Sequence, residues 1–128
     1  MIVVLDADVV IGALDADDAH HDEARKLLHT WQREGATRLV ALVNLTEVLV
    51  APAADPARLR RAREAVAALG ITPYAPTEAI AVDAARERLR HPISLPDAYA
   101  LATARHVGGR LRTFDRTLSQ IAIAEGIG

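Results

Sequence analysis

Apolar and polar residues follow two different periods along the chain, and the changes of period separate predicted strands from predicted helices. Short unbroken apolar runs rich in β-branched residues are typical of buried parallel strands. Elsewhere apolar residues recur every three or four positions, as Ala24, Leu27, Leu28 and Trp31 do, which is the spacing of one helix face. We expect four strands, with a fifth left open near the C-terminus; they cover residues 2–5, 39–43, 71–74, 110–113 and, for the fifth, 121–124.

Cap and turn residues mark where the predicted helices begin and end. Asp55-Pro56 combines a capping carboxylate with proline at the first helical position, and Asn44, Thr77 and Ser94 are also expected to be helix caps. Helices are therefore expected at residues 8–14, 21–35, 44–50, 55–70, 77–89 and 94–108, with a brief one after residue 115.

The alternation of these elements predicts the fold class. Neither Asn-Gly nor Asp-Gly, the common hairpin turns, occurs in the chain. Strands that alternate with helices form βαβ units, in which helices cover both faces of a parallel sheet. A chain of 128 residues is long enough for one domain with its own core. We expect a single α/β domain over residues 1–128, a three-layer α/β/α sandwich with a central parallel sheet of four to five strands.

Composition bears on location more than on chemistry. The chain is 51% hydrophobic and 25% charged with a net charge of −2, as in globular proteins. It has no cysteine, which excludes disulfides and thiolate metal sites and fits a cytoplasmic location. The apolar N-terminus reaches Asp6 without a basic segment, so it predicts a strand and not a signal peptide. No apolar run approaches the length of a membrane span.

The basic residues are nearly all arginines, because Lys26 is the only lysine. The planar guanidinium suits phosphate groups. Arginines cluster at residues 58–63, 86–90 and 105–116, and for each cluster alone a solvated helix face is the preferred interpretation. The adjacent histidines at residues 20–21 are expected to be solvated in a loop, and the other three histidines show no partner pattern.

Four carboxylates lie at boundaries between the predicted elements: Asp6, Glu47, Asp97 and Asp115. Asp6 and Asp115 each follow a predicted strand, and the carboxyl ends of parallel strands meet at one edge of a sheet. Crowded acids repel unless they are protonated or neutralised by a cation, and an all-oxygen cluster suits Mg²⁺ or Mn²⁺. We therefore expect divalent-metal chemistry on a phosphate.

Each acid also has an ordinary structural explanation. Asp6 and Asp115 would cap the helices that follow them, and the segments at residues 44–47 and 94–97 have the outline of a capping box. Capping accounts for each acid alone. It does not account for the expectation that all four lie at one edge of a sheet.

The chain resembles the PIN-domain nucleases, and among them the VapC-type toxins of bacterial toxin–antitoxin pairs. The resemblance covers essentially the whole length and rests on VLDADVVIGAL, NLTEVL, LPDAYALATA and RTFDRTL in this order. It implies a sandwich with a parallel sheet, whose acidic site residues correspond to Asp6, Glu47, Asp97 and Asp115.

Two further positions near these acids are singled out by the resemblance. Thr113 corresponds to a hydroxyl that supports the site. Asp8 departs from the family pattern, in which many relatives carry serine, threonine or asparagine there. It is expected to be either an additional acid beside the ions or a first-turn residue that interacts with the helix dipole.

The activity that the resemblance implies is that of a Mg²⁺- or Mn²⁺-dependent endoribonuclease. Carboxylates in such a site hold one or two hydrated ions, which polarise the scissile phosphate and activate the attacking water. Asp6 is the expected central ligand, Asp97 and Asp115 complete the coordination, and Glu47 orients a water or contacts the ion. The implied partners are an RNA substrate, a VapB-type antitoxin and a second copy in a homodimer.

Three other functions stay open. A PIN nuclease of RNA processing is the closest of them. Residues 6–9 also have the D-x-D-x-[TV] form of haloacid dehalogenase phosphatases, in which Asp6 would be the nucleophile and Asp8 an acid/base. Those enzymes need a later lysine and a late acidic pair, and Lys26 is too early. A pure interaction module, with the acids as caps, is the non-enzymatic alternative.

Overall fold

Strands and helices alternate along nearly the whole chain, as the sequence pattern predicts. A computed structural model describes all 128 residues. The elements in chain order are β1 (Ile2–Leu5), α1 (Ala7–Leu14), α2 (His21–Arg33), β2 (Thr37–Ala41), α3 (Leu42–Leu49), the 3-10 helix η1 (Pro52–Ala54), α4 (Pro56–Ala68), β3 (Ile71–Tyr74), α5 (Glu78–Arg90), α6 (Leu95–His106), β4 (Arg110–Arg112) and α7 (Arg116–Ala124).

All four strands are parallel and lie in the order β3-β2-β1-β4. The first strand is therefore internal, with Val4 opposite Leu39 of β2 on one side and Leu111 of β4 on the other. Because β1 is hydrogen-bonded along both edges and covered on both faces, the residue that follows it, Asp6, leaves the middle of the carboxyl edge of the sheet.

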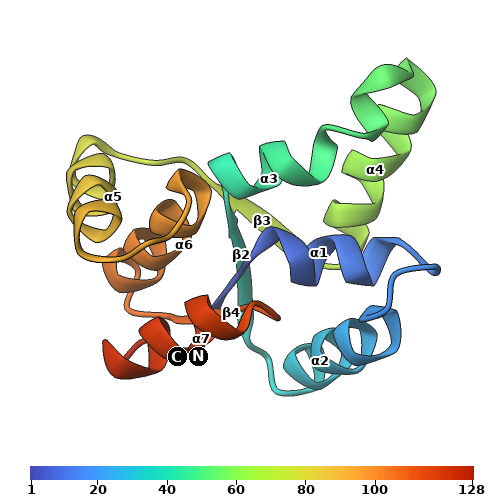
Figure 1. The fold of residues 1–128 in the computed structure, drawn as a ribbon. Coiled ribbons are helices and arrows are strands. Elements are labelled where there is room, and N and C mark those ends of the chain that lie inside the picture. Colours follow the sequence, from blue (N-terminus) through green and yellow to red (C-terminus); the bar gives the residue numbers. More distant parts are fainter.

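Helices cover both faces of the sheet (Figure 1), with α1 and α2 on one side of the strands and α5 and α6 on the other. Successive side chains of β1 point to opposite faces. Val3 and Leu5 pack with residues of α1, α2 and α4, whereas Val4 packs with residues of α5, α6 and α7. The two cores confirm the predicted three-layer sandwich with a parallel sheet of four strands. Every helix is either too short or too polar to cross a lipid bilayer.

The expected helix caps are present at three positions. The carboxylate of Asp55 accepts a hydrogen bond from the Ala57 N–H at 3.2 Å, and Pro56 is the first residue of α4. The hydroxyls of Thr77 and Ser94 accept hydrogen bonds, also at 3.2 Å, from the third residue after each. The cap residues that the sequence predicts therefore mark the starts of α4, α5 and α6.

The end of one predicted strand is wrong, and another predicted strand is absent. The second strand ends at Ala41 rather than at residue 43, so Asn44 lies inside α3 and does not cap it. An apolar run of this length fits a strand or a buried helix turn equally well. The optional fifth strand at residues 121–124 is the end of α7, in which Leu118 and Ala122, four residues apart, both pack into the core.

Leu101 of α6 tests the layered packing. It is 0% exposed in the core beneath α5 and α7. We expect Leu101→Ala to lower the free energy of unfolding by about 2–5 kcal/mol in urea denaturation, because a cavity remains where the side chain was. Leu89 of α5 is 90% exposed, so Leu89→Ala is the matched control, with an expected effect within about 0.5 kcal/mol. Equal losses at the two positions would contradict this arrangement of α6.

Candidate active site

Acidic and polar side chains from four parts of the chain meet at the carboxyl edge of the sheet. They come from the start of α1, from α3, from the start of α6 and from the segment between β4 and α7. The group consists of Asp6, Asp8, Asn44, Glu47, Asp97, Thr113 and Asp115.

Asp6 lies at the centre of this group and is buried, with 5% of its surface exposed. One carboxylate oxygen accepts hydrogen bonds from the Ala7 N–H at 2.8 Å and from the Asn44 side-chain amide at 3.3 Å. The other oxygen accepts from the Thr113 hydroxyl at 2.7 Å. Burial, and then repulsion from Asp8, raises the pKa of Asp6 from 3.8 to about 7 despite these donors.

Asn44 is a site residue that sequence reasoning assigned to the wrong role. It is completely buried, and its amide nitrogen lies 3.3 Å from Asp6 Oδ1, 3.4 Å from Glu47 Oε1 and 3.2 Å from the Pro96 carbonyl oxygen. One NH₂ group thus links α3 to the end of β1 and to the start of α6. An asparagine within an apolar segment, one helical turn before an acid, is the signal in the sequence that could have indicated this role.

Thr113 and Asp8 form the side of the site next to β4. The Thr113 hydroxyl is 3.2 Å from Asp8 Oδ2, and its oxygen accepts a hydrogen bond from the Asp115 N–H at 3.0 Å. Asp8 Oδ2 also accepts from the Phe114 N–H at 3.0 Å, whereas its buried Oδ1 has no hydrogen-bond partner. Burial is the main cause that raises the pKa of Asp8.

The three remaining acids line the outer part of the same group. Partial burial, and then the negative charge of Asp97, raises the pKa of Glu47. Burial raises the pKa of Asp97 as well, and repulsion from Asp115 adds to that rise. Asp97 also contributes to the raised pKa of Asp6. The structure therefore brings the four acids expected from the sequence into one electrostatically coupled group.

Capping and clustering prove compatible, because a carboxylate has two oxygens. Asp6 Oδ1 and Asp115 Oδ1 each accept a hydrogen bond at 2.8 Å from a backbone N–H of the helix that follows. At the start of α6 the Ser94 hydroxyl accepts a hydrogen bond from the Asp97 N–H, and hydrogen bonding with Ser94 partly offsets the rise in the Asp97 pKa, which agrees with the predicted capping box. Only the capping interpretation of Glu47 is wrong, since α3 begins at Leu42.

The donor set fits a hard divalent cation. It offers only oxygen ligands, and none of these acids forms an ion pair with a basic side chain. Two buried oxygens, Asp8 Oδ1 and Asn44 Oδ1, have no hydrogen-bond partner. A divalent cation would favour the ionised form of these carboxylates and oppose the rise of the Asp6 pKa.

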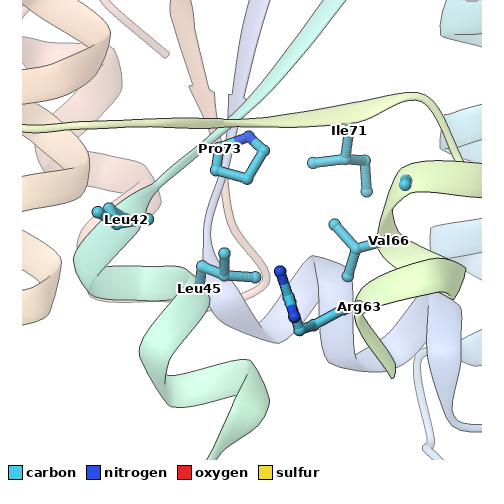
Figure 2. A pocket seen from close by; sticks show the side chains of 7 residues that line it. Leu42, Leu45, Arg63, Val66, Ile71 and Pro73 are labelled. Carbon is cyan, nitrogen blue, oxygen red and sulfur yellow. The ribbon is translucent and has the colours of Figure 1, made fainter. Parts of the chain in front are cut away.

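Two hollows lie near α3, and only one of them touches the acids. A cavity of about 460 Å³ between α3, α4 and β3 is lined mainly by apolar residues such as Leu45 and Val66, with Arg63 beside them (Figure 2). A second hollow, of about 400 Å³, has Glu47 and Arg58 on its walls. The second hollow therefore has one acid of the group, Glu47, and one arginine of α4, Arg58, on the same walls.

The adjacent histidines are not both solvated loop residues, as the sequence had suggested. His21 is the first residue of α2, is partly buried and has its Nδ1 2.8 Å from the Gly12 carbonyl oxygen, so the prediction is wrong for it. His20 is exposed, but its ring stacks on that of Phe114 with centroids 4.3 Å apart. Neither side chain belongs to the acidic group.

Asp6→Asn should raise stability at about pH 8 and have a smaller effect in acid. Between pH 3.8 and about 7, native Asp6 keeps a proton that the unfolded chain has lost, so stability falls as the pH rises through this window. The variant avoids this loss. In metal-free protein at about pH 8 we expect a gain in the free energy of unfolding of roughly 2–4 kcal/mol, because one pKa unit corresponds to about 1.4 kcal/mol.

Urea denaturation with a chelator, repeated over a pH series, measures this difference. The gain should shrink as the pH falls toward 3.8. Asp22→Asn on the exposed face of α2 is the control and should show no such pH dependence. A variant at position 6 that is less stable than the parent at about pH 8 would contradict the uncompensated burial of this carboxylate.

Solved structures of a bacterial toxin, of a toxin–antitoxin complex and of VapBC-1 share this fold. A toxin–antitoxin complex from Klebsiella pneumoniae is 24% identical, with a TM-score of 0.72 over 88% of this chain and 86% of that chain. VapC20 of Mycobacterium tuberculosis, a toxin that cleaves the sarcin-ricin loop, is 17% identical, with a TM-score of 0.73 over 93% of this chain and 94% of that chain. VapBC-1 of nontypeable Haemophilus influenzae is 13% identical, with a TM-score of 0.71 over 98% and 94%.

Sequence comparison gives the family directly. No curated protein sequence matches the chain. The sequence profile of the PIN domain, however, matches residues 3–124, which include all of the four strands except Ile2 and all the acids described above. The chain therefore belongs to the PIN domain family.

Proposed function

We propose that this PIN domain, over residues 1–128, is a Mg²⁺- or Mn²⁺-dependent endoribonuclease and the toxin of a type II toxin–antitoxin pair. The observation that carries the proposal is the buried Asp6 carboxylate, whose pKa is raised to about 7 amid four other acids. Membership of the PIN family and the shared fold of ribonuclease toxins support this function.

In this proposal Asp6 is the central metal ligand, and its surroundings hold it in place. Hydrogen bonds from Ala7, Asn44 and Thr113 fix both carboxylate oxygens, so little reorientation is needed when a cation binds. Bound there, Mg²⁺ or Mn²⁺ supplies a Lewis acid for the scissile phosphate and lowers the pKa of the attacking water. Asn44 is a positioning residue, because it also contacts Glu47.

The outer acids have separate roles in the proposed reaction. Asp97 and Asp115 supply carboxylate oxygens for the cation from the starts of α6 and α7. Glu47 is exposed and has a raised pKa, which suits a group that orients water and accepts its proton. Thr113 and Asp8 support the site: Thr113 donates to Asp6, and Asp8 adds negative charge beside it.

The partners follow from the same site. RNA is the proposed substrate, and a VapB-type antitoxin is proposed to inhibit the enzyme by placing a cationic side chain among the acids. Structures of a toxin–antitoxin complex and of VapBC-1 with this fold support an antitoxin partner. We further propose that the protein acts in the cytoplasm as a homodimer.

The geometry is less favourable for a phosphatase of the haloacid dehalogenase type. The only lysine, Lys26, is an exposed residue of α2 and makes no contact with the acids. A PIN nuclease of RNA processing differs from the proposal only in having no antitoxin.

Cleavage of structured RNA tests the proposed activity. We expect the purified protein to cut RNA with Mn²⁺ or Mg²⁺ and to stop when a chelator is added. Asp97→Asn should lower the cleavage rate by about 100-fold or more, because it replaces a proposed ligand. Asp55→Asn, which changes an acid that caps α4, is the matched control and should keep full activity. Chelator-resistant cleavage, or an unaffected Asp97 variant, would refute the metal-dependent mechanism.

Arg58 is expected to bind the RNA backbone beside the acids. It lines the same hollow as Glu47, and a guanidinium there would attract phosphate. Arg58→Ala should raise KM for RNA several-fold with little change in kcat, and reduce the salt dependence of binding by about one phosphate contact. Arg61 is exposed on the same helix but does not line the hollow, so Arg61→Ala is the control. Identical salt dependence in the two variants would argue against this path for RNA.

A further inference from the structure

A second group of charged side chains lies where the C-terminal end of α5 meets α6 and the end of α7. Its centre is Glu87, whose side chain is 0% exposed. Around it lie Asp83, Arg90, His91, Arg105 and Glu125. The proposed nuclease site uses none of these residues.

The two arginines form close ion pairs with only some of the carboxylate oxygens in this group. Arg105 is 2.7 Å from Glu87 Oε1, 2.6 Å from Glu125 Oε2 and 2.6 Å from Asp83 Oδ2. Arg90 is 3.2 Å from the same Glu87 Oε1. The second oxygen of Glu87, Oε2, is buried and has no hydrogen-bond partner. Three carboxylates against two guanidinium groups leave one net negative charge when His91 is neutral and Glu87 is ionised, and burial and then the neighbouring Glu125 raise the pKa of Glu87.

The free oxygen of Glu87 faces two other potential metal ligands. His91 Nε2 is 3.6 Å from Glu87 Oε2 and 3.2 Å from Glu125 Oε1. One ligand atom from each of Glu87, His91 and Glu125 lies within 4.8 Å of the other two. His91 and Glu125 have side chains that are 28% and 17% exposed, so the group is open to ions from solvent.

A proton on His91 does not satisfy this arrangement. The Nε2 atom carries at most one proton, and Glu125 at 3.2 Å is the nearer acceptor. Glu87 Oε2, at 3.6 Å, is then beyond hydrogen-bond distance. A buried carboxylate oxygen without a donor is costly, and a divalent cation bound by all three side chains would remove that cost.

We propose that Glu87, His91 and Glu125 form a second metal site, which takes a borderline divalent transition metal such as Zn²⁺. One imidazole nitrogen and two carboxylates make a donor set for Zn²⁺, whereas Mg²⁺ prefers oxygen ligands alone. Arg105 and Arg90 bind the other carboxylate oxygens and so orient the ligands, as hydrogen-bonded partners of metal ligands commonly do.

The site would connect helices that are far apart in the sequence. Glu87 and His91 lie in the last turn and at the C-cap of α5, four residues apart, and Glu125 is the C-cap of α7. Bound Zn²⁺ would hold α7, which begins directly after Asp115, against α5. Because the unfolded chain does not bring these ligands together, binding would stabilise the folded protein.

A Zn²⁺ titration of the whole metal-stripped protein tests the proposal without RNA cleavage. With excess Mg²⁺ present to occupy the acidic site, the parent should bind about one equivalent of Zn²⁺ and show a higher Tm. Co²⁺ in place of Zn²⁺ should give visible absorption bands that change with loss of an imidazole ligand. Loss of a residue that only orients a metal ligand weakens metal binding by roughly 10–100-fold. Because His91 is itself a proposed ligand, we expect His91→Gln to weaken Zn²⁺ binding by more than this.

Matched variants make the outcome decisive. His106 is an exposed histidine of α6 with no partner here, so His106→Gln should bind Zn²⁺ as the parent does. Glu125→Gln provides a second test if the variant at His91 folds poorly, and it too should lose the Tm increase. The proposal is overturned if the parent binds no Zn²⁺ at micromolar concentration, or if His91→Gln binds it as tightly as His106→Gln. Loss of RNA cleavage alone would bear on the nuclease proposal and not on this site.

Discussion

The burial of one carboxylate at the end of the central strand is the constraint on which the candidate active site depends. Asp6 follows β1, which is flanked by β2 and β4, so its side chain leaves the sheet where water has little access. Three hydrogen-bond donors do not balance this burial, and the pKa of Asp6 is raised to about 7. Such a group reduces stability at neutral pH unless a cation binds, which favours a functional explanation for its presence.

The fold brings further acids to this point through the same geometry. In a parallel sheet, each strand ends at the carboxyl edge, and the following helix starts there with its positive dipole end. Asp6 and Asp115 occupy such strand-to-helix junctions, and Asp97 lies in the first turn of α6. Residues that begin helices therefore also surround the site. The cap hydrogen bond uses one carboxylate oxygen of Asp6 and one of Asp115.

The parts of the structure that the sequence predicted are those set by local pattern. The strand at residues 2–5, the caps at Asp55 and Thr77, and the acids after β1 and β4 all depend on neighbouring residues. The wrong predictions depend on tertiary packing. The run at residues 39–43 could not be divided between strand and helix without knowing that α3 packs against α1 and α6.

The site residues that sequence analysis did not identify are those whose partners lie far away along the chain. The residues next to Asn44 in the sequence predict a helix cap. Its contacts in the structure are with Asp6 and Pro96, which are 38 and 52 residues away, so the local pattern does not show them. Glu87 and His91 have helical i,i+4 spacing, which is a visible clue, but Glu125 completes their group only through the packing of α7. No local pattern carries this information, because it depends on which helices meet.

The most direct measurement of the central claim is a carbon-13 NMR titration of the Asp6 carboxyl group, with and without Mg²⁺. We expect this carboxyl to titrate near pH 7 in metal-free protein and at clearly lower pH when Mg²⁺ is present. Titration near pH 3.8 in both conditions would contradict this expectation, since burial would then not raise the pKa of Asp6 and Mg²⁺ would not lower it.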